Sequence, residues 1–200
     1  MILSGNEIGK EVEAGNINID PFNPKHLNST SVDLTLGSGV TVYEDWTWVD
    51  DSSHSKDGSD IRPWSDLKVL DTKKPARVKK FKIDPDIGWV ICPNVAYLMH
   101  TVERIHTEKY VPILDGKSSI GRLFIQVHST AGFGDPGFNG QYTLEVTTQF
   151  SVRVYPGMRF CQMRFQTIQG EVTSYKNLGH YTGDQAKGAV ASRAYETTMD

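Results

Sequence analysis

The stretch STAGFGDPGFNGQYTLE, residues 129–145, places four glycines and one proline in front of a run of strand-forming residues. Clusters of glycine and proline mark turns between strands, so we expect a hairpin here. Residues 141–155 then alternate in polarity, and alternate residues of a strand point to opposite faces. The apolar face is predicted to hold Tyr142, Leu144, Val146, Phe150, Val152 and Val154. Glu145 falls on the opposite, polar face, where a carboxylate needs a chemical explanation.

Strand and turn patterns continue on both sides of this stretch. Residues 89–105 resemble two strands separated at Pro93–Asn94, and residues 122–129 alternate as a further strand. A turn at 155–160, YPGMRF, precedes another strand at 161–168. Many short strands with glycine and proline turns and almost no helix predict an all-β fold, either a sandwich or a jelly-roll barrel.

The N-terminal part of the chain adds a short helix and further strands. Ser4 is placed to cap a helix that ends near Gly15, and residues 31–44 alternate like a pair of strands. Residues 50–63 are polar and predict an exposed loop. The tryptophans expected to pack beneath that loop are Trp46, Trp48 and Trp64.

Composition limits the functional classes. The chain has 200 residues, a length that suits one domain over residues 1–200. Its formal net charge is −3 and its pI is about 6.1. An acidic chain has no general attraction for nucleic acid or anionic membranes, so we expect neither partner and interpret the basic run at 71–80 as a solvated strand edge. Cys92 and Cys161 are too few for a disulfide framework and indicate a reducing compartment, the cytoplasm.

Residues 115–122, DGKSSIGR, combine a glycine turn with two hydroxyls and two cations. Backbone N–H groups of a turn and serine hydroxyls can hold phosphate oxygens while Lys117 or Arg122 neutralises them. The guanidinium of Arg122 is the better shaped of the two cations for this task. A polar hairpin turn would explain the same residues.

Asp135, Phe138 and Gly140 form a D-x-x-F-x-G pattern at the predicted hairpin. Glycine lets the backbone approach a ligand closely, and an aromatic ring there can pack against a sugar and leave no room for a 2′-hydroxyl. A β-turn with a hydrophobic plug is the alternative explanation.

His106 and Glu108 fit the H-x-E half of the zinc deaminase signature. The other half, P-C-x-x-C, is missing from the sequence. We therefore assign His106 to ordinary strand or turn structure.

Taken together, residues 115–145, the turn YPGMRF and the segment GAVASR at 188–193 resemble the dCTP deaminase family of the dUTPase-like superfamily. Residues 17–37 resemble the N-terminal segment of the same family. The resemblance implies a distorted jelly-roll β-barrel with a short N-terminal helix. It also implies a homotrimer with nucleotide sites between chains and a flexible C-terminal arm, about residues 176–200, that closes over the ligand.

The same resemblance implies partners and cofactors. The expected substrates are dCTP and dUTP, with Mg²⁺ carried by the triphosphate and dTTP as a regulator. No zinc and no metal bound by protein residues are expected. The expected location is the cytoplasm, that of the host if the source is viral.

Family members use the glutamate that matches Glu145 as the catalytic acid–base, and the resemblance adds Ser118, Arg122 and Asp135 to the catalytic set. The residues expected to bind the nucleotide are Lys117, Ser118, Ser119, Ile120, Gly121, Arg122, Thr130, Ala131, Asp135, Phe138, Thr143, Leu144, Glu145, Tyr175, His180 and Gln185. The pair His180–Tyr181 stands where family members usually carry Lys-Tyr, so this chain departs from the family pattern there.

Hydrolytic deamination explains why a carboxylate is needed. Water adds to C4 of cytosine, so a proton leaves the water, N3 gains a proton, and the amine departs protonated. One carboxylate beside C4 and N3 can move these protons. Without zinc to activate the water, hydroxyl and carbonyl groups must hold it. By resemblance the candidates are Ser118 and the backbone of Thr130–Ala131.

Two hypotheses for the product remain open. Some family members stop at dUTP, while others hydrolyse it to dUMP and pyrophosphate in the same site. Many single-activity bacterial enzymes have His-Arg where this chain has Gly132–Phe133, and a small residue there would leave room for a second water beside Asp135. GAVASR instead resembles the single-activity type. We favour two activities.

Two further hypotheses keep the same fold. A dUTPase alone would not need Glu145, because uracil has no amine to lose. A non-catalytic nucleotide sensor would have no need of the proton shuttle.

Overall fold

The computed structural model describes residues 1–44, 70–177 and 181–196. The predicted loop at 50–63, the three tryptophans beside it and His180 lie outside the described residues. The chain divides into two compact units, one of Met1–Thr41 with Lys80–Val190 and one of Val42–Lys79 with Ala191–Asp200. Every described residue of the expected site belongs to the first unit.

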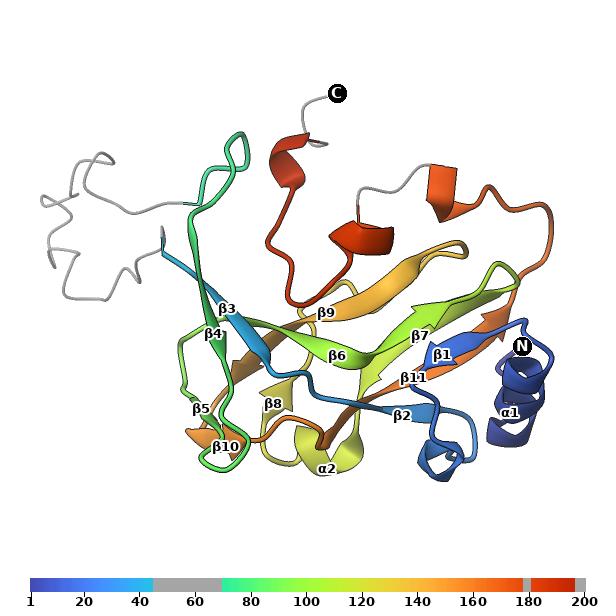
Figure 1. The fold of residues 1–200 in the computed structure, drawn as a ribbon, viewed down its shortest axis with the longest axis horizontal. Helices are drawn as coiled ribbons and strands as arrows, with labels where there is room; N and C mark the ends of the chain where they lie inside the picture. The colour runs from blue at the N-terminus through green and yellow to red at the C-terminus, as the bar shows by residue number, and fades with distance from the viewer. Residues whose placement is uncertain (45–69, 178–180, 197–200) are drawn as a thin grey trace, which may run out of the picture. The chain divides into compact units, whose positions relative to one another are not determined.

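Short strands dominate the secondary structure (Figure 1). The helices are α1 (Gly5–Glu13) and α2 (Ser118–Gly121), and the 3-10 turns are η1 (Pro24–His26), η4 (Tyr175–Asn177), η5 (Gly183–Gln185) and η6 (Ala194–Glu196). The strands are β1 (Asn18–Asp20), β2 (Val32–Thr35), β3 (Gly39–Tyr43), β4 (Val78–Lys82), β5 (Trp89–Ile91), β6 (Tyr97–His106), β7 (Tyr110–Gly116), β8 (Ile125–Gln126), β9 (Asn139–Thr148), β10 (Val152–Val154) and β11 (Arg159–Thr167). The predicted all-β fold is confirmed, and no described helix is long and apolar enough to cross a membrane.

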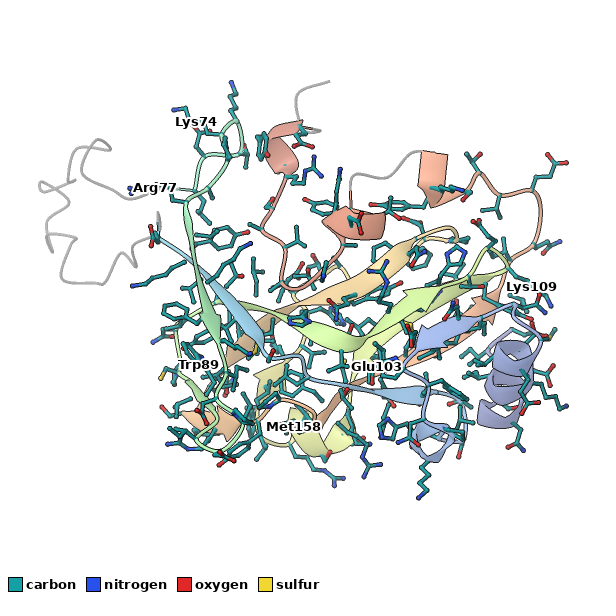
Figure 2. All side chains as sticks on the ribbon, viewed as in Figure 1. Lys74, Arg77, Trp89, Glu103, Lys109 and Met158 are labelled. Atoms are coloured by element: carbon teal, nitrogen blue, oxygen red, sulfur yellow. The ribbon has the colours of Figure 1, made fainter. Side chains whose placement is uncertain are left out.

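The strands of the described residues form three sheets. The largest has the order β4-β3-β6-β9-β8, with β1 paired to β6. A second has the order β2-β11-β7, and β10 pairs with β5 in the third. The pairings of β6 with β9 and of β11 with β7 are antiparallel, and these long strands carry much of the buried core. Figure 2 draws the side chains of the described residues as sticks on the ribbon.

The N-terminal helix follows its capping signals. The Ser4 hydroxyl accepts a hydrogen bond from the amide of Glu7 at 3.2 Å, which satisfies one of the unpaired N–H groups of the first turn. Ile8 is fully buried, and the helix ends before Gly15. The prediction of a short helix between Ser4 and Gly15 is confirmed.

Strand β9 shows the predicted alternation. Leu144 and Val146 are fully buried, while Glu145 and its neighbours Thr143 and Thr147 are only half-buried. The strand ends at Thr148, so Phe150 lies beyond it and is 57% exposed rather than part of the apolar face. The polar face that carries Glu145 therefore follows from the sequence, but the apolar face is shorter than predicted.

Two other strand predictions are wrong in part. β2 and β3 do not pair with each other, because β2 pairs with β11 and β3 pairs with β6. Of residues 122–129, only Ile125–Gln126 form a strand, and Phe124 before it has a left-handed backbone with φ 57°. Alternation in sequence reports which faces are apolar, but it does not report which strand will be the partner.

His100 is a half-buried histidine whose two ring nitrogens are both hydrogen-bonded. Nε2 accepts from the amide of Gly39 at 3.1 Å, and Nδ1 donates to the carbonyl of Thr101 at 2.8 Å. Since an amide only donates and a carbonyl only accepts, this arrangement requires the neutral ring. Burial lowers the pKa of His100 below its usual value.

We predict that protonation of His100 destabilises the fold. The unfolded chain takes up a proton near pH 6.5 and the folded chain at a lower pH, so the free energy of unfolding falls as the pH drops below about 6.5. Urea unfolding at pH 7.5 and at pH 5.5 measures this loss. His100→Gln cannot titrate, so its loss between the two pH values should be smaller than that of the wild type. An equal loss in both proteins would contradict the prediction.

Candidate active site

The short helix α2 presents the predicted phosphate-binding residues at the surface. Ile120 is buried and anchors the turn, while Ser118, Ser119 and Arg122 are exposed. They border a surface pocket of about 510 Å³. The residues that line it are Asn28, Ser29, Thr30, Ser31, Lys117, Ser118, Ser119, Arg122 and Gln162. Hydroxyls and cations thus meet at one pocket, and its role as a phosphate site stays a prediction.

Asp33 lies beneath this pocket and holds Lys117. The Asp33 side chain is fully buried, and its carboxylate accepts from Lys117 Nζ at 2.7 Å and from Arg159 at 3.3 Å. Asn28 donates to the other carboxylate oxygen at 2.8 Å. Because Lys117 is engaged there and no ion pair involves Arg122 within the described ranges, Arg122 is the better placed cation for a bound phosphate.

Gln162 is a pocket residue that the sequence alone does not predict. Its side-chain amide donates to the carbonyl of Gly116 at 2.9 Å and accepts from the Ser31 hydroxyl at 3.0 Å. It therefore joins β11 to the end of β7 and to the loop before β2. Alternation in CQMRFQTI places Gln162 on the face opposite Cys161 and Met163, but the contact with Ser31 depends on sheet pairing over a long separation.

Glu145 lies in the middle of β9 and is held by the loop that follows β8. Its Oε2 accepts from the backbone amide of Ser129 at 2.8 Å. Thr130 and Ala131 follow Ser129 directly in the sequence, and both residues are exposed. Leu144 is fully buried, so only its backbone is available to a nucleotide.

The hairpin tip carries the predicted aromatic residue. The amide of Phe138 donates to the carbonyl of Asp135 at 3.2 Å, and the Phe138 ring lies 4.8 Å from Tyr142 and 6.1 Å from Tyr175. Gly137 has φ 91°, and a side chain there would strike the Ser174 hydroxyl. The structure thus brings Tyr175 to Phe138, as expected if both serve one site.

Tyr142 supports this aromatic cluster from below. Its hydroxyl is buried and has no hydrogen-bond partner among the residues that the structure describes. Burial is the largest cause that raises the pKa of Tyr142 well above its usual range. The nearby charges of Asp135 and Tyr175 raise this pKa further. The phenol therefore stays neutral and serves as packing beneath Phe138.

Part of the C-terminal arm lies against β9. The amide of Gln141 donates to the carbonyl of Ala186 at 2.8 Å, and the amide of Val190 donates to the Thr143 hydroxyl at 3.1 Å. Ala186 is almost fully buried, whereas the neighbouring Gln185 is exposed. Thr143 therefore contacts the arm, two residues from Glu145.

The expected site residues fall into two groups in one chain. The first surrounds α2 and consists of Lys117, Ser118, Ser119, Ile120, Gly121 and Arg122. The second surrounds β9 and consists of Thr130, Ala131, Asp135, Phe138, Thr143, Leu144, Glu145, Tyr175 and Gln185. The pocket at α2 includes no residue of the second group among its lining residues.

The space beside Gly132 is filled by the chain itself. A side-chain carbon on Gly132 would lie 2.6 Å from the carbonyl oxygen of Leu114 and 2.9 Å from Nε2 of His128. A larger side chain would therefore not fit at this position in this conformation, and the hypothesis that Gly132 leaves room for a second water beside Asp135 stays a prediction. Glycine instead allows the loop to approach β7 closely, where the Leu114 amide donates to the Gly132 carbonyl at 2.6 Å.

Comparison with known proteins gives one consistent family. The family model described as dCTP deaminase-like matches residues 2–168. A dCTP deaminase, dUMP-forming, of Clostridium acetobutylicum is 38% identical over 196 residues, which cover 98% of each chain. A protein of the same name from Leptospira biflexa is 39% identical over 185 residues, which cover 92% of each chain.

One solved structure has the same fold. It is the crystal structure of 2′-deoxycytidine 5′-triphosphate deaminase from Agrobacterium tumefaciens, with a TM-score of 0.59 and 18% identity. The match covers 92% of this chain and 53% of that chain, so this chain spans about half of its length. The predicted jelly-roll type of all-β fold is confirmed.

We predict that Asp33→Asn destabilises the protein by about 2 kcal/mol, because it removes the buried partner of Lys117 and Arg159. This is less than for a fully buried pair, since the Arg159 side chain is 53% exposed and can return to water. Urea unfolding measures the change. The matched control is Asp115→Asn, which weakens an exposed pair with Arg164 and should cost under about 0.5 kcal/mol. Equal losses for the two variants would contradict the prediction.

Proposed function

Because the chain belongs to the dCTP deaminase-like family, we propose that it converts dCTP to dUMP by deamination at C4 followed by hydrolysis to dUMP and pyrophosphate. The observation that carries the proposal is a carboxylate held on a strand in a chain whose relatives are named dCTP deaminase, dUMP-forming. The protein is thus a hydrolase that acts on a nucleotide.

In this proposal Glu145 is the proton shuttle. Its carboxylate takes a proton from the attacking water, gives one to N3 of cytosine and protonates the departing amine. The Ser129 amide donates to one carboxylate oxygen, which fixes the orientation of the group and leaves the other oxygen available to the reacting atoms. The half-buried position on β9 limits how far the side chain can turn away.

The nucleotide is proposed to bridge the two groups of residues. Ser118, Ser119 and Arg122 hold the triphosphate with its Mg²⁺, while Phe138 packs against the deoxyribose and Asp135 binds its 3′-hydroxyl or a water. The magnesium ion arrives as part of the substrate. Lys117 supports the triphosphate site through its ion pair with Asp33.

The pocket at α2 is lined by residues of the first group and by none of the second, which supports a homotrimer with sites between chains. The pocket at α2 is lined without Glu145 or Phe138, so a second copy is proposed to supply one of the groups. Regulation by dTTP and a cytoplasmic location rest on the family resemblance and on the cysteine content alone.

We predict that Glu145→Gln slows dCTP conversion by roughly 10²- to 10⁴-fold, the usual contribution of a positioned acid–base. Incubation with dCTP and Mg²⁺, with chromatographic separation of the nucleotides, measures the rate and the product. The wild type should yield dUMP and pyrophosphate without needing to accumulate dUTP. The rate of dUTP hydrolysis should fall less in the variant than the rate of dCTP conversion, because uracil has no amine to lose.

Three outcomes would count against this proposal. A Glu145→Gln variant that deaminates at the full rate would remove Glu145 from the mechanism. A wild type that releases only dUTP would leave a single activity. A wild type that converts dUTP but never dCTP would be a dUTPase.

A further inference from the structure

Phe138 lies just outside the paired part of β9. The strand begins at Asn139, whose register partner in β6 is His106, so the regular ladder between β6 and β9 ends there. The Phe138 carbonyl comes directly before this strand and requires a different partner. A ring that is to pack against a sugar also needs a fixed backbone.

His106 supplies that partner. Its Nδ1 lies 3.0 Å from the Phe138 carbonyl oxygen, and a carbonyl only accepts, so Nδ1 carries the proton. The next residue, Thr107, accepts from the amide of Gly137 through its carbonyl at 2.8 Å. The end of β6 therefore holds the hairpin tip at two successive points.

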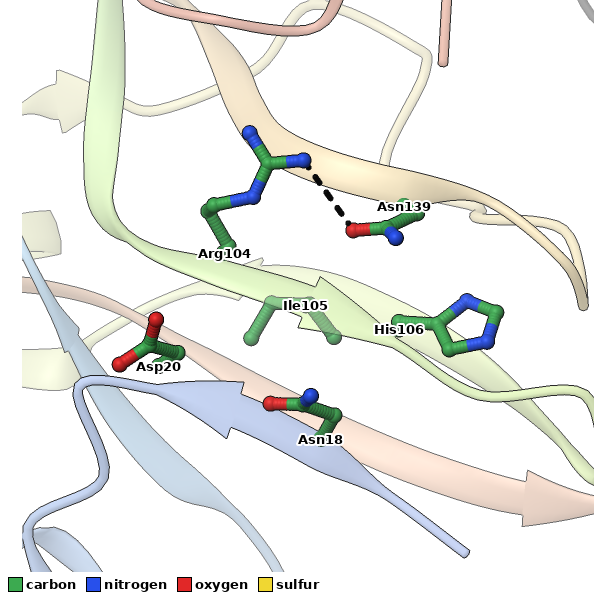
Figure 3. Close-up of a pocket in the computed structure, with 6 residues that line it drawn as sticks. All are labelled: Asn18, Asp20, Arg104, Ile105, His106 and Asn139. Atoms are coloured by element: carbon green, nitrogen blue, oxygen red, sulfur yellow. Dashed lines mark hydrogen bonds between the residues drawn. The ribbon is translucent and has the colours of Figure 1, made fainter. Parts of the chain in front are cut away.

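A second contact on the same face holds Asn139. Arg104 donates to the side-chain oxygen of Asn139 at 3.2 Å, as the dashed line in Figure 3 shows. Arg104 and His106 are two residues apart on β6, so their side chains share a face. They border a surface pocket of about 180 Å³ together with Asn18, Asp20, Ile105 and Asn139.

The ring of Phe138 is confined on its other sides. Tyr142 lies 4.8 Å from it and Tyr175 lies 6.1 Å from it, measured between ring centres. These rings limit sideways movement, but they make no directional bond to the Phe138 backbone. The backbone position is therefore the degree of freedom that His106 controls.

We infer that His106 is a positioning residue that fixes Phe138 and thereby sets the preference for deoxyribose over ribose. The inference rests on the proposed function, in which the ring fills the space of a 2′-hydroxyl. Steric exclusion of one hydroxyl depends on a ring that cannot retreat, and loss of the His106 bond lets the hairpin tip move away. His106 itself touches neither the nucleotide nor the reacting atoms.

The test compares three variants at one position. His106→Leu has similar bulk without a donor, and His106→Gln carries its amide one bond too far along the side chain. His106→Asn places an N–H group where Nδ1 stood. Glu108→Gln is the matched control, because Glu108 approaches only the other ring nitrogen of His106, at 3.9 Å.

The kinetic measurement is the ratio of kcat/KM for dCTP to kcat/KM for CTP. We expect His106→Leu and His106→Gln to lower this ratio roughly three- to tenfold, the effect of losing one hydrogen bond. His106→Asn and Glu108→Gln should stay within about twofold of the wild type. In a Phe138→Ala background, His106→Leu should add less than about twofold, because the two residues act through one another.

A second measurement does not require activity. Amide hydrogen exchange of residues 137–140 in the protein without nucleotide should be faster in His106→Leu and His106→Gln than in the wild type, while His106→Asn stays slow. Unchanged exchange or an unchanged ratio in both variants would overturn the inference, as would a loss in His106→Asn equal to that in His106→Leu. A wild type that is inactive toward dCTP would count against the proposed function, and the exchange result would still decide the role of His106.

Discussion

The hydrogen bond from the Ser129 amide to Glu145 ties the loop after β8 to the middle of β9, and the candidate site is organised around it. Hydrogen bonds to a carboxylate are short and comparatively strong, and this one measures 2.8 Å. Its effect depends on strand register. Leu144 and Val146 are fully buried on either side, so Glu145 must project from the opposite face. A slip of one residue would bury the acid and lose the site.

Side-chain contacts from the core also hold the turn at residues 117–122, which is proposed to bind phosphate. The Asp33 side chain is fully buried and its charge is compensated by both Lys117 and Arg159, so loss of either cation removes part of that compensation. The hairpin tip is held by His106 and Thr107 rather than by regular strand pairing. In each case a short irregular segment that is expected to touch the nucleotide is fixed by a strand of the rigid core.

Local patterns predicted much of this structure. The Ser4 cap, the turn in YPGMRF at Gly157 and the alternation around Glu145 each depend on neighbouring residues, and all three are present. Long-range pairing was not predictable in the same way. β2 and β3 read as one pair but enter different sheets, and Gln162 and His106 gain their roles from strands distant in sequence. Family resemblance supplied the chemistry of Glu145, which alternation could place but not explain.

Conversion of dCTP in ¹⁸O-labelled water tests the central claim most directly, because it follows the oxygen that water delivers. If one water adds to C4 and another attacks the α-phosphate, mass spectrometry should find two ¹⁸O atoms in each dUMP, one in the uracil carbonyl at C4 and one in the phosphate. Product with a labelled phosphate and no label at C4 would show that water never reaches the pyrimidine ring, and would contradict a hydrolytic deamination driven by Glu145.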